Sequence, residues 1–134
     1  ADQLEVRLML ETEAAKLAAT RRTDRDLRVM EEALDARAKA GASVADRVRH
    51  DQAFHHSLVA ASHNSALSEL YDYFSHGIRE TIERTETEAD LPEPSQEDHE
   101  LLLAAVRRRD PVKAEQLARS LLQPSLRALQ GRES

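Results

Sequence analysis

The sequence predicts an all-α protein with one domain. Its 134 residues suit a single hydrophobic core. Apolar residues make up 40% of the chain but aromatic residues only 3%, so the core must consist mainly of Leu, Val, Ile and Ala. Leu and Ala favour helices, and the aromatic and β-branched residues that favour strands are scarce. With three Gly and four Pro, the chain also has few of the residues that tight hairpin turns need.

Composition also limits the class of function. The formal net charge is −6, charges of both signs are mixed, and no long basic block is present. Phosphate binding needs a concentrated positive surface, so we do not expect this segment to bind nucleic acid by itself. The absence of Cys excludes disulfides and fits a reducing, cytoplasmic location, and no apolar run is long enough to span a bilayer. The start at Ala1 fits a fragment whose N-terminal partner domain is missing.

Helical periodicity and capping residues predict six helices, at residues 3–20, 23–40, 43–63, 65–87, 95–109 and 110–129. Five of them begin with a capping residue: Thr23, Ser43, Asn64, Ser95 and Asp110. Gly41 is a stop signal for the second helix. Residues 88–94 are acidic, carry two prolines and form the clearest loop. The domain then covers residues 1–130, and we expect residues 131–134 to form a disordered tail.

The predicted third helix carries polar residues on its apolar line. This line reads Val44, Val48, Asp51, His55 and Leu58, in steps of four, three, four and three residues. Asp51 and His55 therefore occupy core positions on the same helix face. A buried carboxylate has to be paired or coordinated, and a carboxylate with an imidazole can share a divalent cation. An Asp–His pair at this spacing is also a common local hydrogen bond or ion pair, and that alternative stays open.

His99 repeats this pattern on the predicted fifth helix, where it begins a stripe with Leu102, Leu103 and Val106. If that stripe faces the third helix, His99 joins Asp51 and His55. Two imidazoles and one carboxylate would leave open positions on a metal for water or a ligand carboxylate. The alternative for His99 is a partly exposed residue at a helix start. Three further histidines fall off the apolar lines, and we expect them to be solvated or to cap helices: His56, His63 and His76.

Arg7 lies on the predicted inward line of the first helix, with Leu4, Leu10, Ala14 and Leu17. A buried guanidinium needs an anionic partner and can bind a carboxylate through two parallel hydrogen bonds, so Arg7 is a candidate effector-binding residue. The alternative is an ion pair with Glu11, four residues later. The chain has no Gly-rich phosphate loop, nucleophile elbow or His-Glu-x-x-His motif, and we assign no catalytic residue.

Three segments together resemble one protein family. The opening LEVRLMLETEAAKLAATRRTDRDL is similar to the first helices of the FadR-like C-terminal (FCD) domain of GntR-type bacterial transcription regulators. The segment DQAFHHSLVAASHNSAL resembles that family's D-x-x-F-H … N signature. DHELLLAAVRRRDPVKAEQLARSLL resembles its closing pattern of His, apolar residues, Asp and Ala. The motifs occur in the family's order and spacing and span nearly the whole chain.

The resemblance implies an antiparallel bundle of six or seven helices around a pocket for a small organic acid or similar metabolite. Many members hold a divalent metal there, commonly zinc or nickel. The resemblance implies that the corresponding metal ligands in this sequence are Asp51, His55 and His99. Arg7 matches an arginine that often contacts an acidic effector. In the family this domain follows a winged helix-turn-helix that binds operator DNA, which is absent here, and members usually form homodimers. Metal-binding members usually carry one more histidine, where this chain has Leu121; three ligands can still hold a metal, and some members have none.

The leading prediction is therefore an effector-sensing and dimerisation domain that controls an attached DNA-binding domain, and not an enzyme. Two alternatives stay open. A two-histidine, one-carboxylate site with open positions can support metalloenzyme chemistry, although no obvious general base lies beside it. A purely structural dimerisation bundle would have a filled core with neither pocket nor metal.

Overall fold

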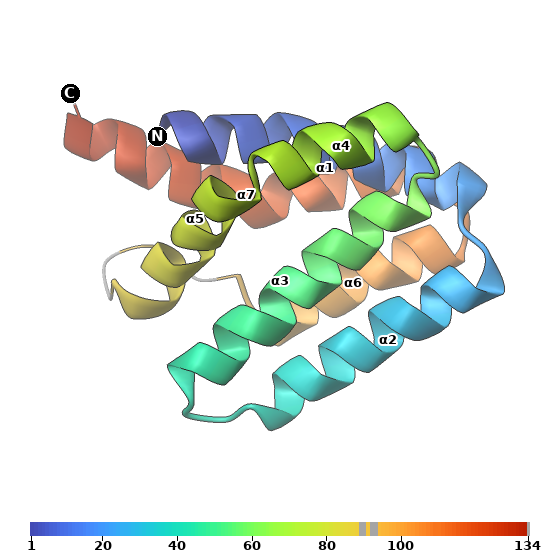
Figure 1. The fold of residues 1–134 in the computed structure, drawn as a ribbon, viewed down its shortest axis with the longest axis horizontal. Helices are drawn as coiled ribbons and strands as arrows, with labels where there is room; N and C mark the ends of the chain where they lie inside the picture. Colours follow the sequence, from blue (N-terminus) through green and yellow to red (C-terminus); the bar gives the residue numbers. More distant parts are fainter. Residues whose placement is uncertain (89–90, 92–93, 134) are drawn as a thin grey trace.

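The chain folds into an antiparallel bundle of helices (Figure 1). The structure is a computed structural model that describes residues 1–88, 91 and 94–133, and these residues form seven α-helices and no strand. The helices are α1 Asp2–Arg21, α2 Asp24–Lys39, α3 Val44–Ala61, α4 Ser65–Tyr73, α5 Ser75–Thr87, α6 Gln96–Arg107 and α7 Pro111–Glu133. The predicted all-α class is confirmed. Among the described helices, none combines the length and the apolar character that a membrane crossing needs.

Two helical segments differ from the prediction. The predicted helix over residues 65–87 is two helices, because the backbone at Phe74 leaves helical geometry, with φ −92° and ψ 4°. The last helix runs to Glu133, so residues 131–133 continue it where we expected a disordered tail. Burial of Leu129 and a 2.7 Å ion pair between Arg132 and Glu88 hold this end against the bundle. Residues 89, 90, 92 and 93 of the predicted loop, and residue 134, lie outside the described residues.

The predicted capping residues act as caps. Four of them accept a hydrogen bond from the backbone amide three residues further on: Thr23, Ser43, Asn64 and Ser95. The Asp110 carboxylate does the same for the amide of Lys113, at 3.1 Å. Gly41 has a φ of 58°, in the left-handed region that glycine adopts without strain, which explains why α2 stops just before it.

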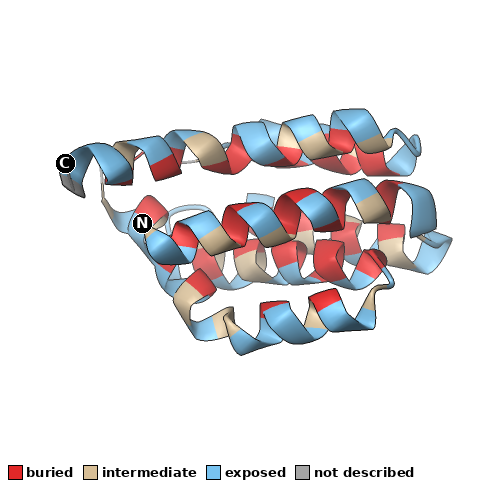
Figure 2. Cartoon of the chain, turned by 90° about the horizontal axis from the view of Figure 1, so that it is seen from above, coloured by how far each residue is buried: buried red, intermediate tan, exposed pale blue. Residues whose placement is uncertain are grey.

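Helix α1 is the centre of the packing, because it contacts α3, α4, α5, α6 and α7. Helix α2 packs on α3 and α6, and α5 packs on α1 and α3. Buried residues line the inner faces of the helices in Figure 2, and exposed residues cover the outside. The core is mostly aliphatic, as the composition predicts, but it also encloses a group of charged and imidazole side chains: Arg7, Glu11, Arg37, Asp51, His55 and His99.

Asp26 connects the start of α2 to the end of α3. Its carboxylate accepts a hydrogen bond from the Thr23 amide at 2.8 Å and lies 2.7 Å from Nε2 of His63. Partial burial raises the pKa of the Asp26 carboxyl, but the bonds to Thr23 and the contact with His63 outweigh it, so the pKa lies below its ordinary value. A carboxyl with a lowered folded-state pKa stabilises the fold above its unfolded pKa and loses that contribution as the pH falls through the folded pKa.

We expect Asp26→Asn to lower the free energy of unfolding by about 1 kcal/mol at pH 7, because the start of α2 loses a negative charge and the carboxylate contact with His63 is lost. The difference from the wild type should begin to close below about pH 4, near the ordinary pKa of aspartate, and vanish only below the lowered pKa of the folded carboxyl. Denaturant unfolding between pH 7 and pH 3 measures both effects. The control is Asp24→Asn, since Asp24 is an exposed acid of the same turn. Equal losses in the two variants, or a gap that does not change with pH, would contradict this expectation.

Candidate metal and effector site

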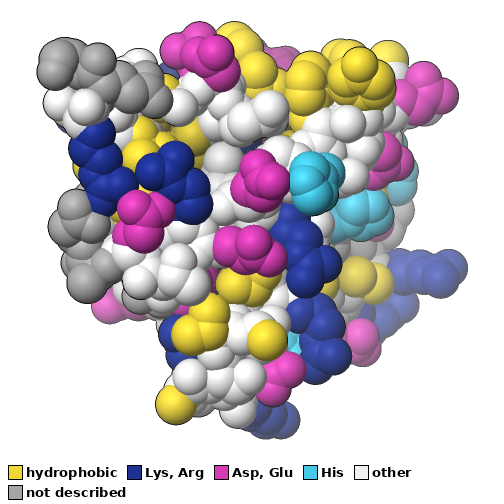
Figure 3. All heavy atoms as spheres, turned by 60° about the vertical axis from the view of Figure 1, so that its left-hand side comes forward, with side chains coloured by type: hydrophobic (Ala, Val, Ile, Leu, Met, Phe, Trp, Pro, Cys, Tyr) yellow, Lys and Arg dark blue, Asp and Glu magenta, His cyan; other side chains and the backbone are white. Residues whose placement is uncertain are grey.

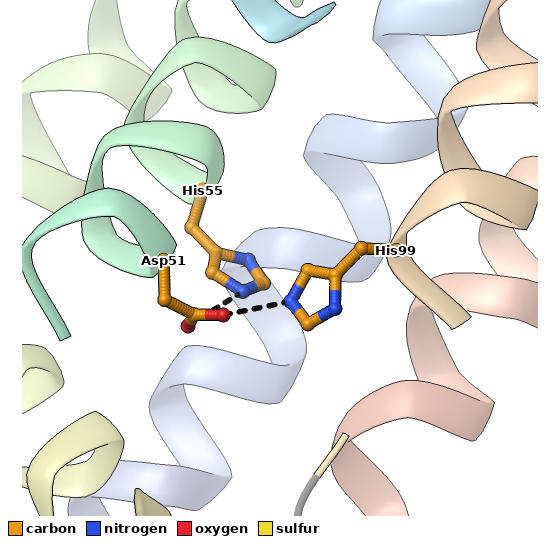
Figure 4. Close-up of side chains that lie close together, drawn as sticks. All are labelled: Asp51, His55 and His99. Atoms are coloured by element: carbon orange, nitrogen blue, oxygen red, sulfur yellow. Dashed lines mark ion pairs between the residues drawn. The ribbon is translucent and has the colours of Figure 1, made fainter. Parts of the chain in front are cut away.

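Asp51 and His55 project from α3 toward His99, which lies in the first turn of α6 (Figure 4). Asp51 Oδ1 lies 2.9 Å from His99 Nε2, and Asp51 Oδ2 lies 3.3 Å from His55 Nε2. One ligand atom from each of the three residues lies within 4.8 Å of the others. All three residues are buried, so His99 is not the partly exposed helix-start residue of the alternative prediction.

Local structure explains how these side chains come together. Ser95 caps α6 and closes a capping box with Asp98, which fixes the first turn that carries His99. Phe54 of α3 packs edge-on against both imidazoles, with ring centroids 5.4 Å from each. The two imidazole centroids are 5.3 Å apart. An aromatic ring thus covers one side of the polar cluster and sets the orientation of both histidines.

Each imidazole has oxygen acceptors beside both of its nitrogens. His99 Nδ1 donates to the Ser95 carbonyl at 2.7 Å, so Nε2 of a neutral His99 carries the lone pair and faces Asp51. His55 Nδ1 touches the Glu11 carboxylate, and His55 Nε2 faces Asp51. Among the described atoms, neither buried Nε2 has a hydrogen-bond partner. A lone pair that faces a carboxylate requires a proton or a metal ion between the two.

The geometry fits a shared divalent cation. Imidazole nitrogens and carboxylate oxygens lie about 2.0–2.2 Å from zinc, so two such ligands at bond angles of 90–109° are about 3.0–3.4 Å apart. The distances from Asp51 to the imidazoles, 2.9 Å from Oδ1 and 3.3 Å from Oδ2, each agree with that separation, so an ion bound to both oxygens would lie near both imidazoles. Both Nδ1 atoms lie beside an oxygen acceptor, as the outward nitrogen of a metal-bound histidine usually does.

Arg7 and Glu11 of α1 lie against this cluster. Arg7 Nε donates to Glu11 Oε2 at 2.6 Å, and Arg7 Nη1 donates to the Thr81 hydroxyl at 3.3 Å. Arg7 Nη2 lies 4.0 Å from Asp51 Oδ2. The alternative pairing of Arg7 with Glu11 is therefore present, and the same guanidinium also faces the cluster.

The surrounding charges keep both carboxyl groups ionised. Burial raises the pKa of the Glu11 carboxyl, but the neighbouring His55 and Arg7 outweigh it and lower that pKa to about 2. Burial likewise raises the pKa of the Asp51 carboxyl, but His55 and His99 hold it well below its ordinary value. Two buried anions are thus stabilised by the groups around them.

Arg37 near the end of α2 also belongs to this site, although no motif marks it. Its Nε donates to Asp51 Oδ1 at 2.8 Å. A sequence signal for it exists, because Arg37 continues the buried line of α2 through Leu27, Met30 and Leu34 in steps of three, four and three. An arginine on an apolar line, like Arg7 on α1, indicates a buried anionic partner.

Other predicted positions lie outside the cluster. Leu121 is 5% exposed and belongs to the main apolar core, so α7 supplies no imidazole there. Val44, placed on the inner line of the third helix by its spacing, is 38% exposed because it stands at the very start of α3. The remaining three predicted histidines are exposed, as expected, and each lies near one acidic side chain: His56, His63 and His76.

Surface cavities lie near the cluster without including it. A groove of about 660 Å³ between the start of α3 and α5 is lined in part by Val44 and Arg79, and by none of the three predicted metal ligands. A smaller cavity of about 90 Å³ is lined in part by Gln3, Gly77 and Thr81. Its wall includes Thr81, the residue whose hydroxyl accepts a hydrogen bond from Arg7, so the cavity lies on the Arg7 side of the cluster.

The fold and the site define an all-α bundle whose core buries two carboxylates, two imidazoles and two guanidinium groups. The chain belongs to the FCD domain family, which it matches over residues 2–124. FCD domains are parts of GntR-family transcription regulators, which are not enzymes. The resemblance of the sequence motifs to this family is thereby confirmed.

Individual relatives agree with this assignment. The chain is 35% identical over 130 residues to the galactonate operon transcriptional repressor of Escherichia coli (strain K12), which covers 93% of this chain and 55% of that protein. It is 38% identical over 82 residues to the HTH-type transcriptional regulator LutR of Bacillus subtilis (strain 168), covering 61% of this chain and 37% of that protein. The chain thus spans little more than half the length of the first of these relatives, and less of the second.

Solved structures share the fold. The Streptococcus agalactiae GntR structure matches with a TM-score of 0.75 and 26% identity, over 95% of this chain and 57% of that one. The Escherichia coli McbR/YncC structure matches with a TM-score of 0.79 and 21% identity, over 99% of this chain and 65% of that one. At these identities the structural similarity establishes the fold. The chemistry of the site has to be argued from the residues of this chain.

We expect Arg7→Met to lower the free energy of unfolding by about 3–5 kcal/mol, because two buried carboxylates lose a cation. The double variant Arg7→Met/Glu11→Leu, which removes both charges of the pair, should recover part of this loss. Arg79→Met is the matched control, since Arg79 pairs with Glu83 at the same spacing on the surface, and it should cost less than about 1 kcal/mol. Urea unfolding measures all three variants. Equal losses of unfolding free energy for Arg7→Met and Arg79→Met would show that the buried ion pair contributes no more to stability than the surface pair.

Proposed function

We propose that this domain senses a small organic acid through a divalent metal ion held by Asp51, His55 and His99. The observation that carries the proposal is the pair of buried Nε2 atoms that face the Asp51 carboxylate without a hydrogen-bond partner among the described atoms. A zinc or nickel ion would supply the positive charge that all three side chains lack. Membership of the FCD family supports a regulatory role for such a site.

Arg7 is the proposed contact for the acid. Three protein ligands leave open positions on the ion, which carboxylate or hydroxyl oxygens of an effector would occupy. The Arg7 guanidinium faces the same cluster and is held on its other side by Glu11. The name of the Escherichia coli relative connects that protein with galactonate, a carboxylate with several hydroxyl groups, and this makes sugar acids a reasonable class of effector to test here.

The domain would pass its signal to an attached DNA-binding domain in a cytoplasmic homodimer. A ligand can do so only by preferring one arrangement of the helices over another. Helices α1 and α4 contact each other and carry three exposed hydrophobic residues, Met9, Leu70 and Tyr73, which favour this face for the second subunit. Hydrophobic side chains also gather along the upper edge of Figure 3, the edge along which α4 runs in Figure 1.

One observation favours a second candidate, a structural bundle with a metal-free core of ion pairs. Burial lowers the pKa of the His55 imidazole, but Glu11 outweighs it and the pKa is raised, so a doubly protonated His55 would also satisfy the two carboxylates beside it. In that case Asp51 needs no ion, because Arg37 and the imidazolium neutralise it. Metal binding separates the two candidates.

Calorimetric titration of the protein with Zn²⁺ or Ni²⁺ tests the proposal. We expect one ion per chain and, for Asp51→Asn, an affinity reduced by more than about tenfold, because a ligand loses its charge. Asp46→Asn is the control, since Asp46 lies on the same helix but not in the cluster. The Zn²⁺-loaded protein should then bind galactonate or another small carboxylate, and Arg7→Ala or His55→Ala should weaken that binding.

Galactitol, which lacks the carboxylate, serves as the ligand control for galactonate. Binding of neither ion, together with no acid bound from a panel of small carboxylates, would leave the structural bundle as the function. If Asp51→Asn binds the ion as tightly as the wild type does, the metal binds at another site and the proposed ligand set is refuted.

A further inference from the structure

Arg37 is buried with a partner for each of its nitrogens. Its side chain is 6% exposed, and Nε donates to Asp51 Oδ1 at 2.8 Å. Nη1 donates to the Gln96 side chain at 3.0 Å, and Nη2 donates to the Pro94 carbonyl at 3.0 Å and lies 3.6 Å from Glu86. Helices α2, α3, α5 and the start of α6 thus meet at one guanidinium. The contacts other than Asp51 would keep this guanidinium in place without the aspartate.

The oxygen of Asp51 that binds Arg37 is also the oxygen that faces His99. Oδ1 lies 2.8 Å from Arg37 Nε and 2.9 Å from His99 Nε2, whereas Arg7 is 4.0 Å away on the other oxygen. An ion held by Asp51 and His99 would therefore share its carboxylate with a guanidinium, which stays charged at every accessible pH. Two positive charges this close in a buried site repel each other strongly.

We propose that Arg37 is an internal counter-cation that competes with the metal ion for Asp51 and so weakens metal binding. This role rests on the metal site of the proposed function. Without an ion, Arg37 neutralises Asp51 and removes the cost of a buried, unpaired carboxylate. With an ion, that neutralisation is redundant and the charge of Arg37 opposes binding. The domain would then bind its metal more weakly than its three ligands alone would allow. The leucine at position 121, where metal-binding members usually carry a histidine, would weaken metal binding as well.

Zn²⁺ titration of Arg37→Met tests this competition. Met keeps an unbranched, apolar side chain but removes the charge, and we expect the affinity for Zn²⁺ to rise by about tenfold or more, because the repulsion between the guanidinium and the ion is lost. Arg47→Met is the matched control, because Arg47 binds the same Glu86 at 2.9 Å and the Gly41 carbonyl at 2.6 Å. It should leave the affinity unchanged. Adding Asp51→Asn to Arg37→Met should abolish the gain, which places the ion at the same carboxylate.

The possible outcomes separate this role from the metal function itself. If the wild type binds Zn²⁺ and Arg37→Met binds it equally or more weakly, Arg37 only positions Asp51, the competition is refuted and the metal site stands. If only Arg37→Met binds Zn²⁺, the competition is supported in its strongest form. If neither protein binds Zn²⁺, the metal site and the competition both fall. Arg37→Gln, which is uncharged and places an amide nitrogen near the position of Arg37 Nε, replaces Arg37→Met if that variant does not fold.

A second measurement uses the wild-type protein and needs no variant. The ¹⁵Nε–H signal of Arg37 should shift when Zn²⁺ binds. The reason is that Asp51 Oδ1, which accepts the hydrogen bond from Nε, would then also bind the ion. The corresponding signal of Arg47, which donates to Glu86, is the internal control and should stay in place. An Arg37 signal that does not move at saturating Zn²⁺ would overturn the competition.

Discussion

The buried carboxylate of Asp51 is the constraint on which the centre of this bundle depends. An ionised carboxylate away from water is stable only when hydrogen-bond donors or positive charges surround it. Here Arg7 of α1 and Arg37 of α2 supply positive charge, and His55 of α3 and His99 of α6 face the same carboxylate. One side chain therefore ties together the helices that enclose the site, and the same convergence creates a place where a cation can bind.

The arginines and the proposed metal ion would compete at this carboxylate. The two imidazoles offer lone pairs that a cation would satisfy, while the two arginines already neutralise the acid. The apolar Leu121, which supplies no further ligand, would shift this competition away from the metal. Helix α1 contacts five of the other helices and carries both Arg7 and Glu11, so a ligand that moves Arg7 acts on the helix with the widest packing. That connection is how occupancy of a small site would alter the arrangement of the bundle.

The sequence predicts most of the fold because helix starts are local. Thr23 and Ser95 form their capping boxes with residues three positions away, so the sequence alone locates them. The break at Phe74 has no such signal, because no side chain caps the start of α5. Asp51, His55 and His99 were recognisable as polar residues on apolar lines, and the family resemblance pointed to the same three residues. Arg37 was not recognised among the several arginines of α2, although its place on the line of Leu27, Met30 and Leu34 is a signal, and its partners come from other helices.

Anomalous X-ray diffraction at the zinc or nickel absorption edge, on crystals grown with that ion, tests the central claim most directly. We expect one strong peak enclosed by the Asp51 carboxylate and the Nε2 atoms of His55 and His99. A map in which the ion binds only at surface histidines, with the Arg37–Asp51 contact intact and nothing between the two buried imidazoles, would contradict the claim and leave a core held together by ion pairs alone.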